Sequence, residues 1–362
     1  MWDKSRSERL WKEANIMGAA AILPETKFSE VAKPPPSVVS FLDIVHDDLV
    51  AVEGLLGNEI RSDVKAAYAI SGHTLSAGGK RLRPALVILA AHAADKLFPA
   101  HTVFASAAAA ELIHMASLIH DDVVDGSAER RGRPTANATF GNQISVLVGD
   151  YLLAKSIYLA AREGNIDVIR VFSNVTVGLS EGEVLQITAK GDVDTSEETY
   201  LTIIQKKTAG FIAGCCEVGA MLAGASEAEV AALTRYGKNC GLAFQIADDL
   251  LDYTGDPQKT GKPLCGDLRE GKMTLPLILT LRDVSEAERA HLLHILEEPE
   301  ALTDAEIADV RATILRHDGY VRTSDAARRY VETAQTALLD LPPSAYRDSL
   351  HALADYALTR ER

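Results

Sequence analysis

The sequence is poor in cysteine and in positive charge. Its 362 residues include four cysteines, and no two of them have the C-x-x-C spacing of zinc or redox motifs. This excludes a disulfide scaffold and favours reduced, buried thiols, so we expect a cytoplasmic protein. The net charge of −14 argues against a nucleic-acid partner.

Long apolar runs and internal linkers are also missing. No stretch approaches 18 consecutive apolar residues, so we expect no integral membrane segment. Three prolines at 34–36 form a stiff stretch, and we expect residues 1–40 to be an N-terminal extension with a proline-rich linker. No later Pro/Gly/Ser-rich stretch divides the chain, so we expect one domain over 41–362, although the length alone suggests two.

Alternation of apolar and polar residues, the pattern of a half-buried strand, is absent as well. Apolar residues recur instead at three- and four-residue spacing, with abundant alanine. We therefore expect an all-α fold, with helices packed around a common core and no strands. The expected helices are 41–60, 62–74, 85–95, 101–122, 140–162, 165–186, 196–223, 227–253, 274–282, 285–297, 303–315, 318–338 and 344–358.

Two acidic clusters, each reading D-D-x-x-D, close two of these apolar helices. They consist of Asp121, Asp122 and Asp125, and of Asp248, Asp249 and Asp252. On a helix the first and last aspartates of each cluster share a face and can share a ligand, whereas the middle one is rotated about 100° away. Carboxylates are unfavourable at the C-terminal end of a helix, so each cluster needs a cation. Oxygen donors suit Mg²⁺; a solvated acidic helix end is the alternative for either cluster alone.

Basic blocks accompany the acidic clusters. Gly78–Pro84 reads GGKRLRP, and its glycines, Lys80 and Arg83 are suited to a diphosphate. Residues 129–134 read ERRGRP just after the first cluster, and further cations are Lys206, Lys207, Lys262 and Lys272. A solvated face is the alternative for each block alone. Together they predict two anionic ligands, one bridged by metal and one held directly by cations.

Other catalytic motifs are absent: we find no P-loop, no H-E-x-x-H, no G-x-S-x-G and no E-x-x-H pair. His114 lies seven residues before Asp121, about two helical turns away. It can be either a core histidine or a ligand-binding residue, and the sequence leaves both open.

At this point the sequence resembles a known family, the trans (all-E) isoprenyl diphosphate synthases of the long-chain type. The resemblance covers about residues 40–360 and rests on GGKRLRP, LIHMASLIHDDVVD (112–125), ERRGRP, the Lys207-Thr208 pair, FQIADDLLDYTGD (244–256) and GKPLCGDLREGKMTLPLI (261–278). It implies the isoprenoid synthase (prenyltransferase) fold, with helices around a central catalytic cavity, and a homodimer. The implied reaction joins isopentenyl diphosphate head-to-tail to an allylic diphosphate.

The resemblance also implies roles for single residues. Both aspartate motifs would be catalytic, with Mg²⁺ held by Asp121, Asp125 and Asp248, three ions per active site when the allylic substrate is bound. The allylic diphosphate would contact Arg130, Lys207, Thr208, Gln245 and Lys262, and Lys272 would also bind substrate. Isopentenyl diphosphate would contact Lys80, Arg83, His114 and Arg131.

Product length is expected to depend on the helix that precedes the first aspartates. Ala116 and Ser117, five and four residues before Asp121, are small, whereas short-chain members of the resembled family often carry an aromatic floor here. We therefore expect a heptaprenyl to decaprenyl product, with a deeper floor at Phe104 or Tyr158. The alternatives are a short-chain farnesyl or geranylgeranyl synthase, a terpene cyclase, and a non-catalytic partner subunit.

Overall fold

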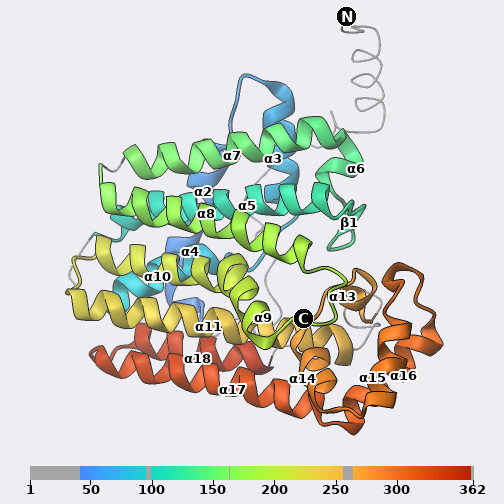
Figure 1. The fold of residues 1–362 in the computed structure, drawn as a ribbon. Coiled ribbons are helices and arrows are strands. Elements are labelled where there is room, and N and C mark those ends of the chain that lie inside the picture. The colour runs from blue at the N-terminus through green and yellow to red at the C-terminus, as the bar shows by residue number, and fades with distance from the viewer. Residues whose placement is uncertain (1–40, 95–98, 163, 256–263, 360–362) are drawn as a thin grey trace, which may run out of the picture. The chain divides into compact units, whose positions relative to one another are not determined.

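The computed structural model describes residues 41–94, 99–162, 164–255 and 264–359, and these fold almost entirely as helices (Figure 1). The expectations for residues 1–40 and for Lys262 lie outside this described part. The helices are η2 Asp43–Val45, α2 His46–Glu59, α3 Lys65–Ser76, α4 Leu82–Ala93, η3 Ala100–Val103, α5 Phe104–Val124, α6 Ala136–Phe140, α7 Asn142–Arg162, α8 Ile166–Thr188, α9 Glu197–Ile204, η4 Gln205–Ala209, α10 Gly210–Leu222, α11 Glu227–Thr254, α13 Gly266–Arg269, α14 Leu275–Asp283, α15 Glu286–Ile295, η5 Pro299–Ala301, α16 Asp304–Arg316, α17 Gly319–Ala337, η6 Leu338–Asp340 and α18 Ala345–Thr359.

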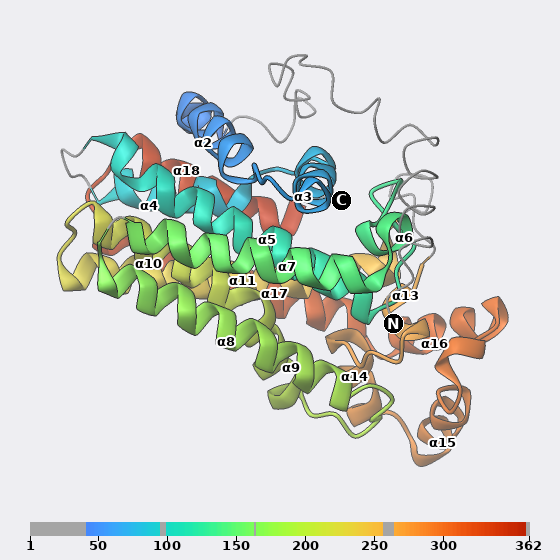
Figure 2. The same cartoon turned by 90° about the horizontal axis from the view of Figure 1, so that it is seen from above.

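Helix α5 is the central element of the first half of the fold. It packs against α7, α4 and α2, with further contacts to α8 and α10 (Figures 1 and 2). Its residues 105–113 are all buried. Small alanine side chains let neighbouring helices approach closely along this stretch. The helix ends at Val124 with Asp125 as its C-cap, so the first aspartate cluster lies where the buried helix ends.

Helix α11 joins the two halves of the core. Its start is fixed by a capping box in which Ser226 and Glu229 satisfy each other's backbone N–H groups. Glycine is required at Gly237, since a Cβ there would stand 2.8 Å from the Cα atom of Ala213 on α10. On its other side α11 packs against α17 and α18. This buried frame holds the second aspartate cluster in the last two turns of α11.

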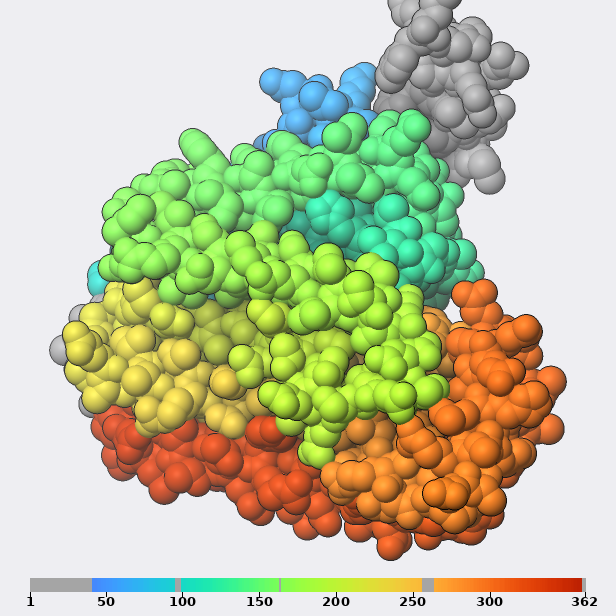
Figure 3. Space-filling view, in the orientation of Figure 1, coloured from blue at the N-terminus to red at the C-terminus, as the bar shows by residue number. Residues whose placement is uncertain are grey.

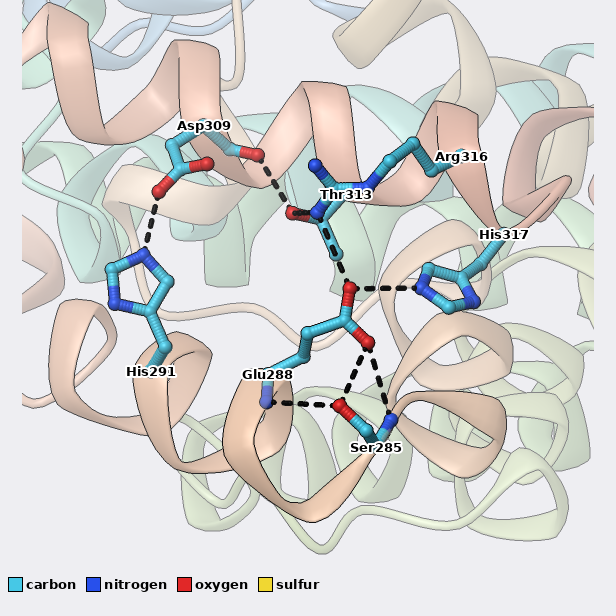
Figure 4. A network of polar contacts seen from close by, with 7 residues as sticks. All are labelled: Ser285, Glu288, His291, Asp309, Thr313, Arg316 and His317. Atoms are coloured by element: carbon cyan, nitrogen blue, oxygen red, sulfur yellow. Dashed lines mark hydrogen bonds and ion pairs between the residues drawn. The ribbon is translucent and has the colours of Figure 1, made fainter.

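A second hydrophobic cluster, built from α9, α11 and α13–α17, lies beneath that end of α11. Its outer layer, α15 and α16, is joined by polar contacts (Figure 4). His291 Nε2 lies 2.6 Å from Asp309 Oδ2, and Glu288 accepts hydrogen bonds from Ser285 and from His317 Nε2. These contacts hold α15 and α16 together on the outside of the second hydrophobic cluster, which lies beneath the second aspartate cluster.

The expected helix 196–223 is interrupted. Between α9 and α10 the backbone widens into a π-helical turn, η4, which carries Lys206, Lys207 and Thr208. A π turn inserts an extra residue and re-aims the side chains on it, and such turns recur at functional sites. The three polar side chains therefore sit on an irregular turn.

The expectation of no strands was wrong at one place. Residues Glu129–Arg130 (β1) and Arg133–Pro134 (β2) form a two-residue antiparallel hairpin. Its central residues Arg131 and Gly132 both have positive φ, as a type I′ turn requires. The stretch is too short to show an alternating pattern, so periodicity could not reveal it.

Two described helices, α5 with the preceding η3 and α7, are long and apolar enough to cross a membrane by length and composition alone. For α5 the apolar window is 72% buried inside the protein, as in the core helix of a helical bundle. All four cysteines, Cys215, Cys216, Cys240 and Cys265, are buried and none forms a disulfide, as expected.

Candidate active site

The three aspartates of the first cluster have different surroundings. Asp122 is buried, and its Oδ1 accepts hydrogen bonds from Arg130 Nε at 2.8 Å and pairs with Arg130 Nη2 at 2.8 Å. Burial raises the pKa of Asp122, and the Arg130 guanidinium opposes that rise. Arg130, expected to contact the allylic diphosphate, is thus anchored to the middle aspartate.

Asp121 and Asp125 are only partly buried and lie one helical turn apart. Burial raises the pKa of Asp121 to about 6; Lys207 opposes this rise, and Glu183 adds to it. Asp125 Oδ1 is buried and accepts no hydrogen bond from any described residue, although Lys190 Nζ stands 3.7 Å away. An unsatisfied buried carboxylate oxygen is costly unless a ligand completes it.

In the second cluster two aspartates are committed to the protein itself. Asp249 is buried and accepts hydrogen bonds from Tyr200 Oη at 2.6 Å and Gln245 Nε2 at 2.8 Å. Asp252 accepts the backbone N–H groups of Gly266 and Asp267, both at 3.1 Å. Its carboxylate therefore caps the start of α13.

Asp248 is the exposed member of the second cluster. The Asp252 carboxylate accepts one backbone N–H group on each oxygen and keeps a further acceptor position on each, so the expectation that Asp248 and Asp252 share one ligand stays a prediction. Asp248 is thus the exposed aspartate of the two motifs, Asp121, Asp125 and Asp252 are partly buried, and Asp122 and Asp249 are buried.

Lys272 links the surroundings of the two clusters. Its Nζ lies 2.6 Å from Glu270 Oε2 and 3.3 Å from Asp267 Oδ1. Burial alone would lower the pKa of Lys272, but Asp267, Glu270 and Asp125 together raise it. Asp267 in turn lies within electrostatic range of Asp248. The ends of α5 and α11 therefore belong to one charged region.

The π turn and α8 supply the polar groups beside the first cluster. The Lys207 ammonium contacts Glu183 of α8, and Thr208 donates to Gln245 Oε1 at 2.8 Å. The Gln245 amide donates onward to Asp249. Thr208, Gln245 and Asp249 therefore form a hydrogen-bonded chain from the π turn to α11.

The two basic blocks pack against each other. Arg131 donates to the carbonyl of Gly78, and Arg133 Nη1 donates to Ser76 O at 2.9 Å. Arg81, which has a left-handed φ of 48°, forms ion pairs with Glu53 at 2.7 Å and Glu111 at 2.9 Å. These contacts fix the loop that carries the predicted isopentenyl diphosphate ligands.

The side chains of Lys80 and Arg83 lie in different environments. Lys80 is exposed, and its Nζ donates to Tyr356 Oη of α18 at 2.5 Å. Arg83 is recessed, with its guanidinium 4.8 Å from the centre of the Phe211 ring. Arg83 Nε is buried and donates to no described residue, so a donor remains available for an anion.

His114 lies close to Arg83. Burial, followed by the charges of Arg83 and Arg131, lowers the pKa of His114 well below its ordinary value. The ring is therefore neutral at neutral pH, and its Nδ1 is buried without a hydrogen-bond partner among the described residues. The sequence left two hypotheses open, a core histidine and a ligand-binding residue. The unsatisfied Nδ1 atom favours the ligand-binding residue.

Sequence reasoning missed the contribution of α8. Glu183 and Gln186 lie three residues apart near the end of this helix, and Lys190 follows just after the helix ends at Thr188. Glu183 Oε2 is paired with Lys207 Nζ, whereas Glu183 Oε1 and Gln186 Nε2 are buried and make no hydrogen bond to any described residue. The available signal was the spacing of Glu183 and Gln186, three residues apart on one helix.

The residues expected to set product length lie in different surroundings, and one of them does not fit its expected role. Ala116 is buried, and the Ser117 hydroxyl donates back to the His114 carbonyl at 2.9 Å. Phe104 is partly buried against the main core. Tyr158 is 60% exposed, so the expectation that it forms a floor is wrong within this chain, because its side chain does not reach the core.

The donor set suits Mg²⁺. Within the described part of the chain, no three His, Cys, Asp or Glu side chains are arranged to hold a metal ion by themselves. The oxygen-only donors and the unsatisfied Asp125 Oδ1 match an ion that keeps its waters and takes phosphate oxygens as further ligands. The residues present therefore fit magnesium bound together with a diphosphate.

Comparison with known proteins places this geometry in context. A family described as polyprenyl synthetase matches residues 64–314. The chain is 39% identical to heptaprenyl diphosphate synthase component 2 of Geobacillus stearothermophilus, over 90% of this chain and 98% of that protein. It is 35% identical to the octaprenyl diphosphate synthase of Escherichia coli, over 88% of this chain and 98% of that one.

Solved structures agree. A decaprenyl diphosphate synthase from Rhodobacter capsulatus superposes with a TM-score of 0.83 and 40% identity, covering 89% of this chain and 98% of that one. The isoprenoid synthase fold expected from the motifs is thereby confirmed. The chain belongs to the polyprenyl synthetase family of prenyltransferases.

Proposed function

We propose that this protein is a Mg²⁺-dependent trans-polyprenyl diphosphate synthase that makes a long-chain product, heptaprenyl to decaprenyl. The observation that carries the proposal is the difference in hydrogen bonding and exposure among the six aspartates of the two motifs. Asp122, Asp249 and Asp252 accept hydrogen bonds from the protein itself, whereas Asp121 and Asp125 lie partly buried near Lys207 and Lys272, and Asp248 is exposed. The similarity to heptaprenyl, octaprenyl and decaprenyl synthases supports the long-chain product.

Asp121, Asp125 and Asp248 would hold the magnesium ions, which supply positive charge for binding the allylic diphosphate and stabilising it as a leaving group. Lys207 is placed beside the same anion by its contact with Glu183. Charge grows on the leaving oxygen as the C–O bond ionises, so cations fixed beforehand stabilise the transition state more than the ground state. Arg130 supports Asp122 and holds the hairpin that carries Arg131 against the site.

Isopentenyl diphosphate would bind at the GGKRLRP loop without metal. Lys80 and Arg83 supply the charge, and the unsatisfied Arg83 Nε is a donor for a phosphate oxygen. Neutral His114 would add a hydrogen bond. The double bond of isopentenyl diphosphate attacks the allylic cation, and the proton then lost can pass to the departing diphosphate. Apolar side chains of α5 and α10 would keep water from the cation.

A homodimer is supported by an apolar surface on two adjacent helices. Of α8, Ile166, Val177 and Val184 share one face, and each is more than half exposed. Leu147 and Tyr158 of α7 are exposed in the same way, and α7 packs beside α8 (Figure 3). Exposed apolar side chains on two adjacent helices are typical of protein interfaces. The reduced, buried cysteines support a cytoplasmic location.

Purified protein should consume isopentenyl diphosphate in the presence of an allylic diphosphate and Mg²⁺, and chelation should stop it. Release of diphosphate from the allylic substrate without consumption of isopentenyl diphosphate would indicate a cyclase instead. The name "component 2" of the Geobacillus relative makes a required second subunit the other candidate. No turnover by the chain alone, restored by a second subunit, would establish it.

A further inference from the structure

Two neighbouring glutamates of α8 contact two neighbouring lysines of the π turn. Glu181 Oε2 lies 2.5 Å from Lys206 Nζ, and both side chains are at least a third exposed. Glu183 contacts Lys207, and only 15% of its side chain is exposed. The same pair of residue types thus occurs twice, once in solvent and once inside the charged region.

The close approach of α8 to the π turn depends on the residue between the glutamates. A Cβ atom on Gly182 would stand 2.8 Å from the Lys207 backbone nitrogen. Only glycine therefore lets the helix come near enough for the Glu183 carboxylate to reach Lys207. The buried contact is built into the backbone packing.

Glu183 also faces the first aspartate cluster. It lies within electrostatic range of Asp121, and its Oε1 atom, the one not paired with Lys207, is buried without accepting a hydrogen bond from any described residue. One turn further along α8, the Gln186 Nε2 is unsatisfied in the same way. These groups border the place where the allylic diphosphate is proposed to bind.

We propose that Glu183 is a positioning residue that holds Lys207 beside the first aspartates and limits how strongly the site retains a diphosphate anion. The inference rests on the proposed function. A carboxylate near a polyanion repels it, and partial burial prevents solvent and salt from screening that repulsion. Every addition of an isoprene unit leaves one diphosphate behind, so a site that retained it would slow each following cycle.

The test compares Glu183→Gln with Glu181→Gln, which removes the same charge from the same helix at an exposed pair. The measured quantities are kcat, the KM for the allylic substrate, and the inhibition constant of inorganic diphosphate with Mg²⁺. Glu183→Gln should tighten diphosphate inhibition by roughly tenfold, with kcat and the allylic KM both lowered. Glu181→Gln should change the inhibition constant less than about twofold, as expected for an exposed pair.

Two further variants complete the design. Glu183→Asp keeps the charge and should show inhibition close to that of the parent protein, whereas Glu183→Met, neutral and of similar size, should behave like the Gln variant and replaces it if that variant does not fold. Unchanged or weaker inhibition in the neutral variants, or equal tightening in Glu183→Asp, would overturn the inference. A parent protein that neither binds diphosphate nor turns over would instead contradict the proposed function.

Discussion

Asp248 and Asp252 lie four residues apart on α11, yet their carboxylates have different surroundings. Asp252 accepts two backbone N–H groups at the start of α13, while Asp248 is exposed. A repeated motif therefore contains one carboxylate suited to an external cation and one that fixes the protein's own backbone. The D-D-x-x-D pattern places an aspartate at both ends and could not predict this difference.

Alanine substitution should separate the two roles. We expect Asp248→Ala to lower kcat at least about a hundredfold, the cost of losing one electrostatic contact in a transition state, with little change in thermal stability. Asp252→Ala removes a helix cap and should destabilise the fold by about 1 kcal/mol. The checks are turnover at saturating Mg²⁺ and the midpoint of thermal unfolding. Near-normal turnover of Asp248→Ala would refute the metal assignment.

His114 gives a pH dependence whose sign is fixed by its burial. Burial and the nearby arginines hold its pKa well below the value of about 6.5 in the unfolded chain. Between those two values the unfolded state binds a proton that the folded state does not, so stability falls as pH drops below about 6.5. The free energy of unfolding should therefore decline less from pH 7.5 to 5.5 in His114→Gln than in the parent protein. Equal declines would show that the ring is already accessible to protons.

At the scale of elements, the helices were predictable because their apolar periodicity is strong. The break at η4 and the hairpin at residues 129–134 were not, since both span only a few residues and depend on tertiary contacts. The same limit applies to the site. Motifs placed the aspartates and the basic loop, but Glu183 joins them only because Gly182 lets α8 approach the π turn.

Substitution of Gly182 tests that packing directly. In Gly182→Ala the new Cβ would stand 2.8 Å from the Lys207 nitrogen and push α8 away from the π turn. We expect kcat/KM for the allylic substrate to fall at least about tenfold, with a lower unfolding midpoint. Gly178→Ala on the same helix is the control, because its Cβ would meet only the Lys206 carbonyl at 3.6 Å. Equal effects of both variants would mean that glycine matters here through helix propensity alone.

At the scale of the whole molecule, the apolar face of α7 and α8 is the feature that a single chain leaves exposed. A charge in the middle of an interface is strongly unfavourable, so Leu147→Asp should convert a dimer to a monomer, as measured by light scattering on a sizing column. Leu315→Asp on α16 changes a residue of similar exposure, 65% against 66%, outside that face and should leave the mass unchanged. A parent protein that is already monomeric would contradict the proposed dimer.

We propose that a long-chain product grows along α5, starting from the first aspartates. This is tested most directly by comparing the product lengths of the parent protein and one variant. With farnesyl diphosphate as primer, labelled isopentenyl diphosphate and Mg²⁺, the parent protein should give heptaprenyl to decaprenyl products on chromatography. Ala116→Phe places a ring on the buried face of α5 and should stop elongation at the geranylgeranyl stage, with Mg²⁺ dependence retained. A parent product no longer than geranylgeranyl, or an unchanged product length in Ala116→Phe, would contradict the account.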